Sequence, residues 1–300
     1  ANVYADFVEN SDDDMGGAIN NTGTINTIEG DFATNSATTG GGAILNSNTG
    51  IIDTINGKFK ENDAGQGGAI NNRGTINKID AKFVRNSAKG AGAVYNSGKI
   101  GTIKGDFAKN SANDKGDGGA IYNFGVYNVG GDIVGGDIDV IEGNFEENTA
   151  TFGGAVYNTG TIKKIDAKFV KNSAKGDNTN LGQGGAIYNG NHGQINIISA
   201  DKDINFVENT ADQGGAVYNS GAIYDGEEKL SEEGTINITA QGGNVVFKGN
   251  SATVDGGAIW NDGTVGLYAA DGKSITFVSD TDSVHNTGIL NINDENHTGS

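Results

Sequence analysis

Hydrophobic residues recur along this chain in short alternating patterns that are separated by polar residues and glycine. The clearest example is a phrase that occurs twice with a single difference, KIDAKFVRNSAKG at 78–90 and KIDAKFVKNSAKG at 164–176. No apolar pattern recurs at the i, i+3, i+4, i+7 spacing of an amphipathic helix, and leucine is scarce. The patterns therefore predict β-strands, and their repetition predicts a stack of equivalent units.

Two phrases alternate along nearly the whole chain. The first is Phe followed three positions later by Asn, and its asparagines are Asn10, Asn35, Asn62, Asn86, Asn110, Asn148, Asn172, Asn209 and Asn250. The second is Gly-Gly-Ala (once Ala-Gly-Ala), then Ile or Val, a variable residue and Asn, and its asparagines are Asn21, Asn46, Asn72, Asn96, Asn123, Asn158, Asn189, Asn219 and Asn261. Phe277 fits the first phrase, but Asp280 stands where its asparagine is expected. A weaker phrase, Thr-Ile-x-x-Ile, lies between the two.

The shortest steps between equivalent phenylalanines, such as Phe59 to Phe83, span about 24 residues, which is a period typical of solenoids. Each unit then holds three short β-prone pieces bounded by Gly, Asn, Asp or Ser. These features predict an all-β fold, a right-handed parallel β-helix of roughly ten coils, since parallel crossovers are right-handed. Coils about 4.8 Å apart would give a rod about 45 to 50 Å long.

Alternation along a strand indicates which side chains point inward. In GGA[I/V]xN, the Ile or Val and the Asn share the inward face, and the variable residue between them is expected to face solvent. Phe of the first phrase and Ile of the third supply the rest of the core. On six successive coils the variable residue is aromatic. These residues predict an outward stripe that is a candidate site for binding a sugar or a protein partner, and a stabilising cross-strand column is the alternative role: Tyr95, Tyr122, Tyr157, Tyr188, Tyr218 and Trp260.

The asparagines at the end of both phrases have a specific use in a stack. A buried amide can donate to its equivalent on one side and accept from its equivalent on the other, which predicts ladders of asparagines along the rod. Asparagine also tolerates the left-handed backbone of a corner, so a simple role as a turn former is the alternative. The Gly-Gly pairs predict tight bends, because no helix follows them as a phosphate-binding loop requires.

Composition limits the function. The chain of 300 residues has 51 Gly, no Pro and no Cys, and its formal net charge is −18. This charge disfavours nucleic acid and anionic polysaccharide as partners. No apolar run approaches the length of a membrane span, so we expect no transmembrane segment. Because the repeats continue without a linker, we expect one domain over residues 1–300, with clear repeats at about 5–261 and a degraded last coil at about 262–300.

Alternating GGA[I/V/L] and FxxN phrases resemble the repeats of the polymorphic outer membrane protein family, whose passengers are secreted by the autotransporter route. The resemblance covers roughly residues 5–261. It implies a right-handed parallel β-helix on the bacterial cell surface or outside the cell, with an adhesive role. A host-cell receptor or a glycan is then the expected partner.

Two other classes of function stay open. Parallel β-helices include polysaccharide-active enzymes, which need paired carboxylates or an acidic metal site with a basic residue nearby. The acidic residues of the insertions are expected to lie in solvated loops, and weak Ca²⁺ binding is the alternative. These residues are Asp12, Asp13, Asp14, Asp132, Asp137, Glu227, Glu228, Glu232 and Glu233. His192 is expected in a turn. We therefore predict no catalytic residue, cofactor or metal site.

The other open class is self-assembly. NVYADFVEN, from residue 2, is expected to form the last part of a coil. The chain is therefore interpreted either as a fragment or processed passenger, or as a filament subunit whose coils stack head to tail.

Insertions indicate where a partner would bind. Residues 124–138, 190–203 and 222–233 all follow the GGA[I/V]xN phrase and precede the next Ile pair, so they are expected to leave from one corner of the rod. Insertions such as 176–183 precede GGA and leave from another corner. Because solenoids commonly bind partners on the face that carries their insertions, the first corner is the predicted binding face.

Overall fold

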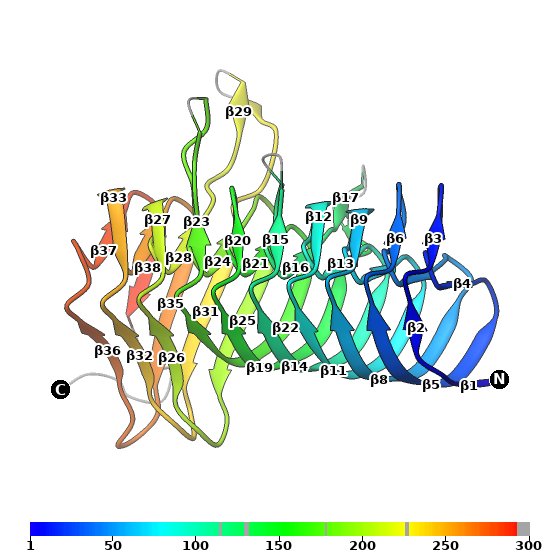
Figure 1. Cartoon of the computed structure of the whole chain (residues 1–300). Helices are drawn as coiled ribbons and strands as arrows, with labels where there is room; N and C mark the ends of the chain where they lie inside the picture. The colour runs from blue at the N-terminus through cyan, green and yellow to red at the C-terminus, as the bar shows by residue number, and fades with distance from the viewer. Residues whose placement is uncertain (114–115, 129–131, 178, 226–227, 293–300) are drawn as a thin grey trace.

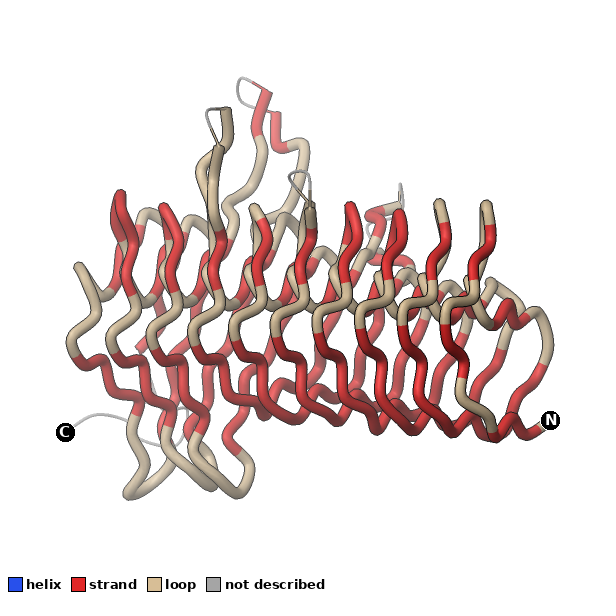
Figure 2. Tube along the Cα trace, in the orientation of Figure 1, coloured by secondary structure: helices blue, strands red, loops and turns tan. Residues whose placement is uncertain are grey.

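The computed structural model describes residues 1–113, 116–128, 132–177, 179–225 and 228–292. Within these residues every regular element is a β-strand, and none is a helix (Figure 2). Strands of consecutive coils pair in parallel, and the coils stack along one axis from β1 to β38 (Figure 1). The predicted β-solenoid of about ten turns is confirmed. The described part of the chain contains no helix long and apolar enough to cross a membrane.

Three parallel sheets, named here A, B and C, form the sides of the rod. Sheet A contains β1 (Asn2–Tyr4), β2 (Phe7–Val8), β5 (Thr24–Ala33), β8 (Ile51–Lys60), β11 (Thr75–Val84), β14 (Lys99–Ala108), β19 (Asp137–Glu146), β22 (Thr161–Val170), β25 (Gln194–Ser199), β26 (Ile204–Val207), β31 (Thr235–Ala240), β32 (Val245–Lys248), β35 (Thr264–Ala269), β36 (Ile275–Val278) and β38 (Ile289–Ile292). Sheet B contains β3 (Ser11–Asp12), β6 (Ser36–Ala37), β9 (Asp63–Gln66), β12 (Ser87–Gly90), β15 (Ser111–Ala112), β20 (Thr149–Ala150), β23 (Ser173–Ala174), β27 (Thr210–Gln213) and β33 (Ser251–Asp255). Sheet C contains β4 (Ile19–Asn21), β7 (Ile44–Asn46), β10 (Ile70–Asn72), β13 (Val94–Asn96), β16 (Ile121–Asn123), β21 (Val156–Asn158), β24 (Ile187–Asn189), β28 (Val217–Asn219), β34 (Ile259–Asn261) and β37 (Val284–Asn286).

Each coil runs from a strand of sheet A through the FxxN corner into sheet B, and then through Gly-Gly-Ala into sheet C. The left-handed backbone at the FxxN corner belongs to the residue before the asparagine, as at Arg85 and Lys171, both with φ 54°. The expectation that the asparagine itself adopts this conformation is therefore wrong. The asparagine is needed for its side chain, since the preceding position accepts Arg, Lys, Glu, Thr and, at Gly249, glycine.

Identical residues stack on one another in the core. The phenylalanines of the first phrase are fully buried from Phe32 to Phe247, and consecutive rings lie parallel, as for Phe83 and Phe107 with centroids 4.6 Å apart. Such stacked pairs contribute about 0.5–1.5 kcal/mol each beyond the burial of their area. The isoleucines of the Thr-Ile-x-x-Ile phrase, such as Ile76 and Ile79, are also fully buried. Phe and Ile thus supply the core, as predicted.

The asparagines of the FxxN phrase form a hydrogen-bonded column inside the corner. Asn86 donates to Asn110 Oδ1 from both its backbone N–H and its side-chain Nδ2, each over 3.0 Å. Asn86 Nδ2 also donates to the carbonyl oxygen of Phe59 on the other side, over 3.0 Å. The column therefore joins three coils at every level, and its members are fully buried from Asn35 to Asn250.

The asparagines of the GGAxN phrase form a second column at the next corner. Asn72 Nδ2 donates to Asn96 Oδ1 over 2.8 Å, and also to the carbonyl oxygens of Gly74 and Lys99. The same pattern repeats along sheet C. One amide thus bonds to the next asparagine and to the backbone carbonyls at the start of two strands of sheet A.

Each column also includes one later residue that departs from its repeat phrase, Asp280 in the first column and Asn286 in the second. Asp280 replaces the asparagine after Phe277, and its Oδ1 accepts hydrogen bonds from the backbone and side chain of Asn250, both over 2.8 Å. In the second column Asn261 donates to Asn286 Oδ1 over 2.7 Å. Asn286 was not predicted, because no Gly-Gly-Ala precedes it. The Val-x-Asn spacing at 284–286 is the only signal that could have identified it.

Replacing a column asparagine in mid-rod is expected to strand its partners. In Asn158→Ala, Asn123 Nδ2 and Asn189 Oδ1 each lose a hydrogen bond of 2.8 Å inside the protein. Because unpaired buried polar groups are costly, we expect the free energy of unfolding to fall by about 1–3 kcal/mol, measured by urea denaturation. Lys168→Ala, an exposed change on sheet A, should alter it by less than about 0.5 kcal/mol. Equal, small effects of both changes would contradict a stabilising role for the column.

Candidate binding site on the insertion face

Three insertions meet at the corner between sheets C and A. We call the described parts of residues 124–136, 190–193 and 220–234 the insertion face. The predicted range 190–203 needs correction, because Gln194–Ser199 is strand β25 of sheet A. Residues 200–203 connect β25 to β26 within that sheet and so leave from a different corner. The sequence thus predicted one long insertion, whereas the structure has two short ones, at 190–193 and 200–203.

Two of these insertions fold as small antiparallel hairpins. β17 (Val126–Tyr127) pairs with β18 (Ile133–Val134), and β29 (Tyr224–Asp225) pairs with β30 (Glu228–Lys229). The hairpin that contains β29 projects far beyond the coils in Figure 1. These are the only antiparallel pairs in the described part of the chain, so the insertions add local structure without interrupting the parallel stack.

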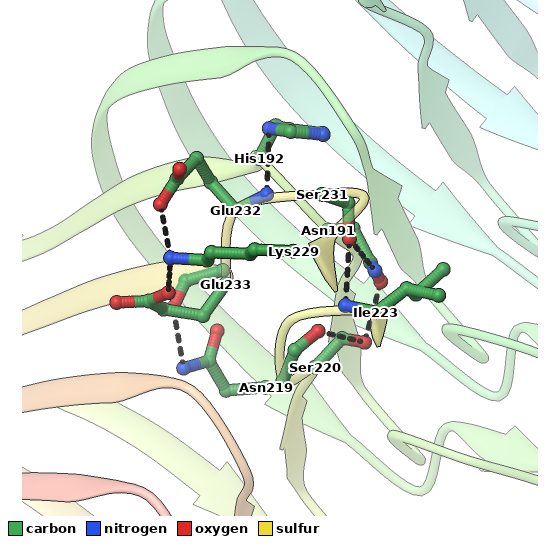
Figure 3. Close-up of polar contacts among 11 residues, drawn as sticks. Asn191, His192, Asn219, Ser220, Ile223, Lys229, Ser231, Glu232 and Glu233 are labelled. Carbon is green, nitrogen blue, oxygen red and sulfur yellow. Dashed lines mark hydrogen bonds and ion pairs between the residues drawn. The ribbon is translucent and has the colours of Figure 1, made fainter. Parts of the chain in front are cut away.

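Hydrogen bonds join the second insertion to the third (Figure 3). Asn191 Nδ2 donates to Ser231 Oγ over 2.7 Å, and Ser220 Oγ donates to Asn191 Oδ1 over 2.6 Å. His192 Nδ1 accepts from the backbone N–H of Glu232 over 3.3 Å. Residues that lie about forty positions apart in the sequence are therefore fixed next to one another.

The first insertion joins this group through ring stacking. The ring of Tyr127 lies on the imidazole of His192, with centroids 3.9 Å apart and an interplanar angle of 13°. A cavity of about 480 Å³ lies beside the pair. Its lining includes side chains from all three insertions and from sheet A: Tyr127, Asp132, His192, Gln194, Glu232 and Glu233.

The cavity is acidic. Burial lowers the pKa of His192, so its ring is neutral at neutral pH and accepts a hydrogen bond at Nδ1. The hydrogen bond from Lys229 lowers the pKa of Glu233, and the same ammonium group bonds to Glu232. Lys229 thus pairs with both glutamates and links strand β30 to the end of the third insertion.

The same insertions also carry large hydrophobic residues that lie open to solvent. Their exposed fractions range from 43% to 58%, and they belong to both hairpins and their flanks: Val126, Tyr127, Val134, Ile223, Tyr224 and Leu230. Such exposed groups on a highly charged protein mark a surface that is suited to a partner. The sequence identified the corner but not these residues, because a short apolar run in an insertion resembles a core segment.

The aromatic stripe lies in register on sheet C, but it is not an open surface. Tyr157 and Tyr188 have ring centroids 4.8 Å apart, and Tyr188 and Tyr218 have centroids 5.1 Å apart. Tyr95 and Tyr218 are only 8% exposed, and the other members of the stripe are half-buried. The expectation that this position faces solvent is therefore wrong for the aromatic coils.

Neighbouring turns cover the stripe from both sides. Phe152, at the end of the segment from sheet B, packs on Tyr188 with centroids 5.5 Å apart. Phe124, which follows the sheet C strand β16, packs on Tyr122 with centroids 5.7 Å apart. Asp262 Oδ2 accepts from the hydroxyl of Tyr218 and from Trp260 Nε1. The geometry favours the alternative role of the stripe as a stabilising column.

The remaining acidic candidates belong to separate parts of the chain, and Asp12, Asp13 and Asp14 follow one another in a single turn. Asp12 accepts hydrogen bonds from the backbone N–H groups of Asp14 and Met15, which lower its pKa, and Asp137 begins strand β19. Glu227 lies outside the described residues. Within the described ranges no three His, Cys, Asp or Glu residues are grouped so that they could hold a metal ion.

A stacked parallel solenoid with insertions on one corner is the architecture of a repeat protein that displays a long surface. Residues 203–220 and 244–262 match the family model of the Chlamydia polymorphic membrane protein (Chlamydia_PMP) repeat. Each segment runs from an FxxN phrase into a GGA phrase. No curated protein and no solved structure matches the chain. The resemblance of these repeats to the polymorphic membrane protein family is confirmed, and repeat type and fold together fit a surface autotransporter passenger.

Replacing a tyrosine of the stripe should lower stability. We expect Tyr157→Ser and Tyr218→Ser each to reduce the free energy of unfolding by about 2–4 kcal/mol, because each removes a stacked ring and leaves a cavity. Tyr224→Ser is the matched control, since Tyr224 is 58% exposed, and it should change stability by less than about 0.5 kcal/mol. Urea denaturation measures all three. An unchanged midpoint for Tyr157→Ser would show that the stripe is not part of the packing.

Asp117 should make stability depend on pH. Burial raises the pKa of its carboxyl group to about 6, so the folded protein binds this proton more tightly than the unfolded chain does. The resulting stabilisation is present at low pH and is lost as the pH rises through about 6. Between about pH 5 and pH 7.5 the loss should be roughly 1–2 kcal/mol.

The neutral variant Asp117→Asn isolates this effect. Between about pH 5 and pH 7.5, the free energy of unfolding of the native chain should fall by roughly 1–2 kcal/mol relative to that of the variant. The other carboxyl groups are common to both proteins and cancel in the difference. A difference that does not change with pH would contradict the buried position of Asp117.

Proposed function

We propose that this chain is the recognition segment of a bacterial cell-surface adhesin, exposed outside the cell, and that it binds its partner through the insertion face. The observation that carries the proposal is the convergence of three insertions from separate coils on one acidic cavity, together with the exposed apolar side chains that two of these insertions carry. The repeat type, which fits a surface passenger, supports the extracellular location. The expected partner is a receptor on a host cell.

The composition of the insertion face favours a protein receptor as the partner. Interfaces commonly combine a few exposed aromatic or aliphatic anchors with polar groups around them. Tyr224, Ile223 and Leu230 supply such anchors on the third insertion, and Val126 and Val134 supply them on the first. Asp132, Glu232 and Glu233 add negative charge between the two groups.

The solenoid gives this face a rigid support. The insertions leave from neighbouring positions of coils whose backbones are hydrogen-bonded to one another, for example Gln194 N–H to Gly160 O over 2.9 Å and Thr235 N–H to Gly193 O over 2.8 Å. Binding groups carried by loops on a rigid scaffold lose little freedom when a partner docks. The segment would therefore act by binding and not by catalysis.

The test removes the apolar anchors of the third insertion. We expect Ile223→Ser, Tyr224→Ser and Leu230→Ser, combined in one variant, to reduce the attachment of beads coated with the purified chain to cultured epithelial cells at least tenfold. The thermal midpoint should stay within a few degrees of the native value, because these side chains contribute little to the core.

The control variant combines Val8→Ser, Leu181→Ser and Val254→Ser, which remove apolar side chains of similar exposure that are not part of the insertion face. It should attach as the native chain does. Equal losses in both variants would show non-specific hydrophobic adsorption. Full attachment of the anchor variant, or no attachment of the native chain, would overturn the proposal and leave self-assembly as the next hypothesis.

A further inference from the structure

A second recessed surface lies on the outside of sheet A, away from the insertion face. It is a groove of about 550 Å³ that crosses four consecutive strands, β8, β11, β14 and β19. Small residues form its floor, and they stand in register from coil to coil: Gly57, Ala81, Gly105 and Gly143. Because equivalent positions of successive coils line it, the groove runs along the rod.

Backbone packing keeps the floor of this groove free of large side chains. A Cβ atom added at Gly57 would clash with the carbonyl oxygen of Gly30, and one added at Gly143 would clash with that of Gly105. Both glycines also have φ near 135°, a conformation that side chains disfavour. The recess is therefore a fixed feature of the stack.

Charged side chains form the two walls. Asp80, Lys104 and Glu142 occupy equivalent positions on one side of the floor, and Lys58, Lys82 and Asp106 lie on the other. Lys202 comes from the connection between β25 and β26 and lines the groove as well.

Some of these charges neutralise one another, and others do not. Lys82 pairs with Asp106 over 3.5 Å, and Asp80 pairs with Lys78 over 3.0 Å. Among the described residues Lys58, Lys104 and Lys202 form no ion pair within 4.0 Å, and all three are exposed. The groove thus presents three available ammonium groups beside carboxylates that can accept hydrogen bonds.

This lining selects among ligand classes. None of the described residues that line the groove is aromatic, which disfavours a neutral sugar held by stacking. The backbone groups of the floor strands already bond to neighbouring coils, so an added peptide strand would find no backbone partners. A ligand that carries anionic groups together with hydroxyl donors satisfies both the lysines and the carboxylates.

We propose that this groove binds a linear acidic polysaccharide, a chain of sugars bearing sulfate or carboxylate groups, laid along the axis of the rod. Anionic groups spaced along the polysaccharide would lie against the ammonium groups of Lys58, Lys104 and Lys202, which stand on separate coils, and sugar hydroxyls would donate to Asp106 and Glu142. The net charge of −18 opposes this ligand at long range. At physiological ionic strength, however, charges act over only about 8 Å, so the lysines of the groove dominate once the ligand is in contact.

The test measures binding of an octasaccharide prepared from heparin to the full chain by isothermal titration calorimetry in about 150 mM NaCl. The groove variant combines Lys58→Gln, Lys104→Gln and Lys202→Gln. The control variant combines Lys89→Gln, Lys175→Gln and Lys248→Gln, which change the net charge equally at exposed positions outside the groove. We expect the groove variant to lose at least tenfold in affinity and the control to stay within about twofold of the native chain.

Each other outcome overturns the proposal. Equal losses in both variants would show non-specific attraction to positive charge, and absence of binding by the native chain would exclude the ligand. Tighter binding of a poly-glutamate peptide than of the octasaccharide would show that the groove takes an acidic peptide. Thermal midpoints of both variants check that the fold is intact. Cell attachment through the insertion face is measured separately, so failure of one proposal does not imply failure of the other.

Discussion

The fold depends on one requirement: every coil must offer the next coil the same donors and acceptors that it receives from the one before. The asparagine columns meet this requirement with a side chain that donates and accepts at once. Asn86 donates to Asn110 Oδ1 and to Phe59 O, and its own Oδ1 accepts from Asn62. A carboxylate can only accept, which explains why Asp280 stands at the last described level of its column, where Asn250 donates to it.

The same requirement explains where variation is permitted. Residues are added between strands and not inside them, because an addition inside a strand would shift every following side chain to the other face of the sheet. The connection at 200–203, between β25 and β26 of sheet A, is one such addition. The insertions at 124–136, 190–193 and 220–234 obey this rule and accumulate at one corner. A binding face therefore arises on the rod without any change to its core.

The two candidate surfaces differ in how their charge compares with the net charge of the whole chain. The insertion face is acidic and apolar, in agreement with the negative charge of the whole chain. The groove over Gly57 and Gly105 gathers lysines on a protein whose 38 Asp and Glu residues outnumber its 20 Lys and Arg residues. A rod of equivalent coils can separate such regions because each coil contacts only its neighbours, so charge on one side does not constrain another.

The repeated residue pattern is enough to predict the solenoid, its period, the buried Phe and Ile positions, and the corner from which insertions leave. It could do so because neighbouring coils are equivalent, so a residue pattern repeated along the chain is also a pattern of contacts in space. Even Asn158 and its equivalents were recognisable, since a buried amide at every level has few other uses.

The contacts that residues of different coils make outside the core cannot be predicted from the repeats and are seen only in the folded protein. The burial of Tyr188 depends on Phe152 from the preceding coil, and the site at His192 depends on Tyr127 and Glu232, which come from insertions without a common pattern. The insertion predicted at 190–203 likewise proved shorter, because Gln194–Ser199 pairs with β31 as strand β25 of sheet A. These contacts join segments that share no repeat, so no periodicity in the sequence records them, and they follow from the folded path of each insertion alone.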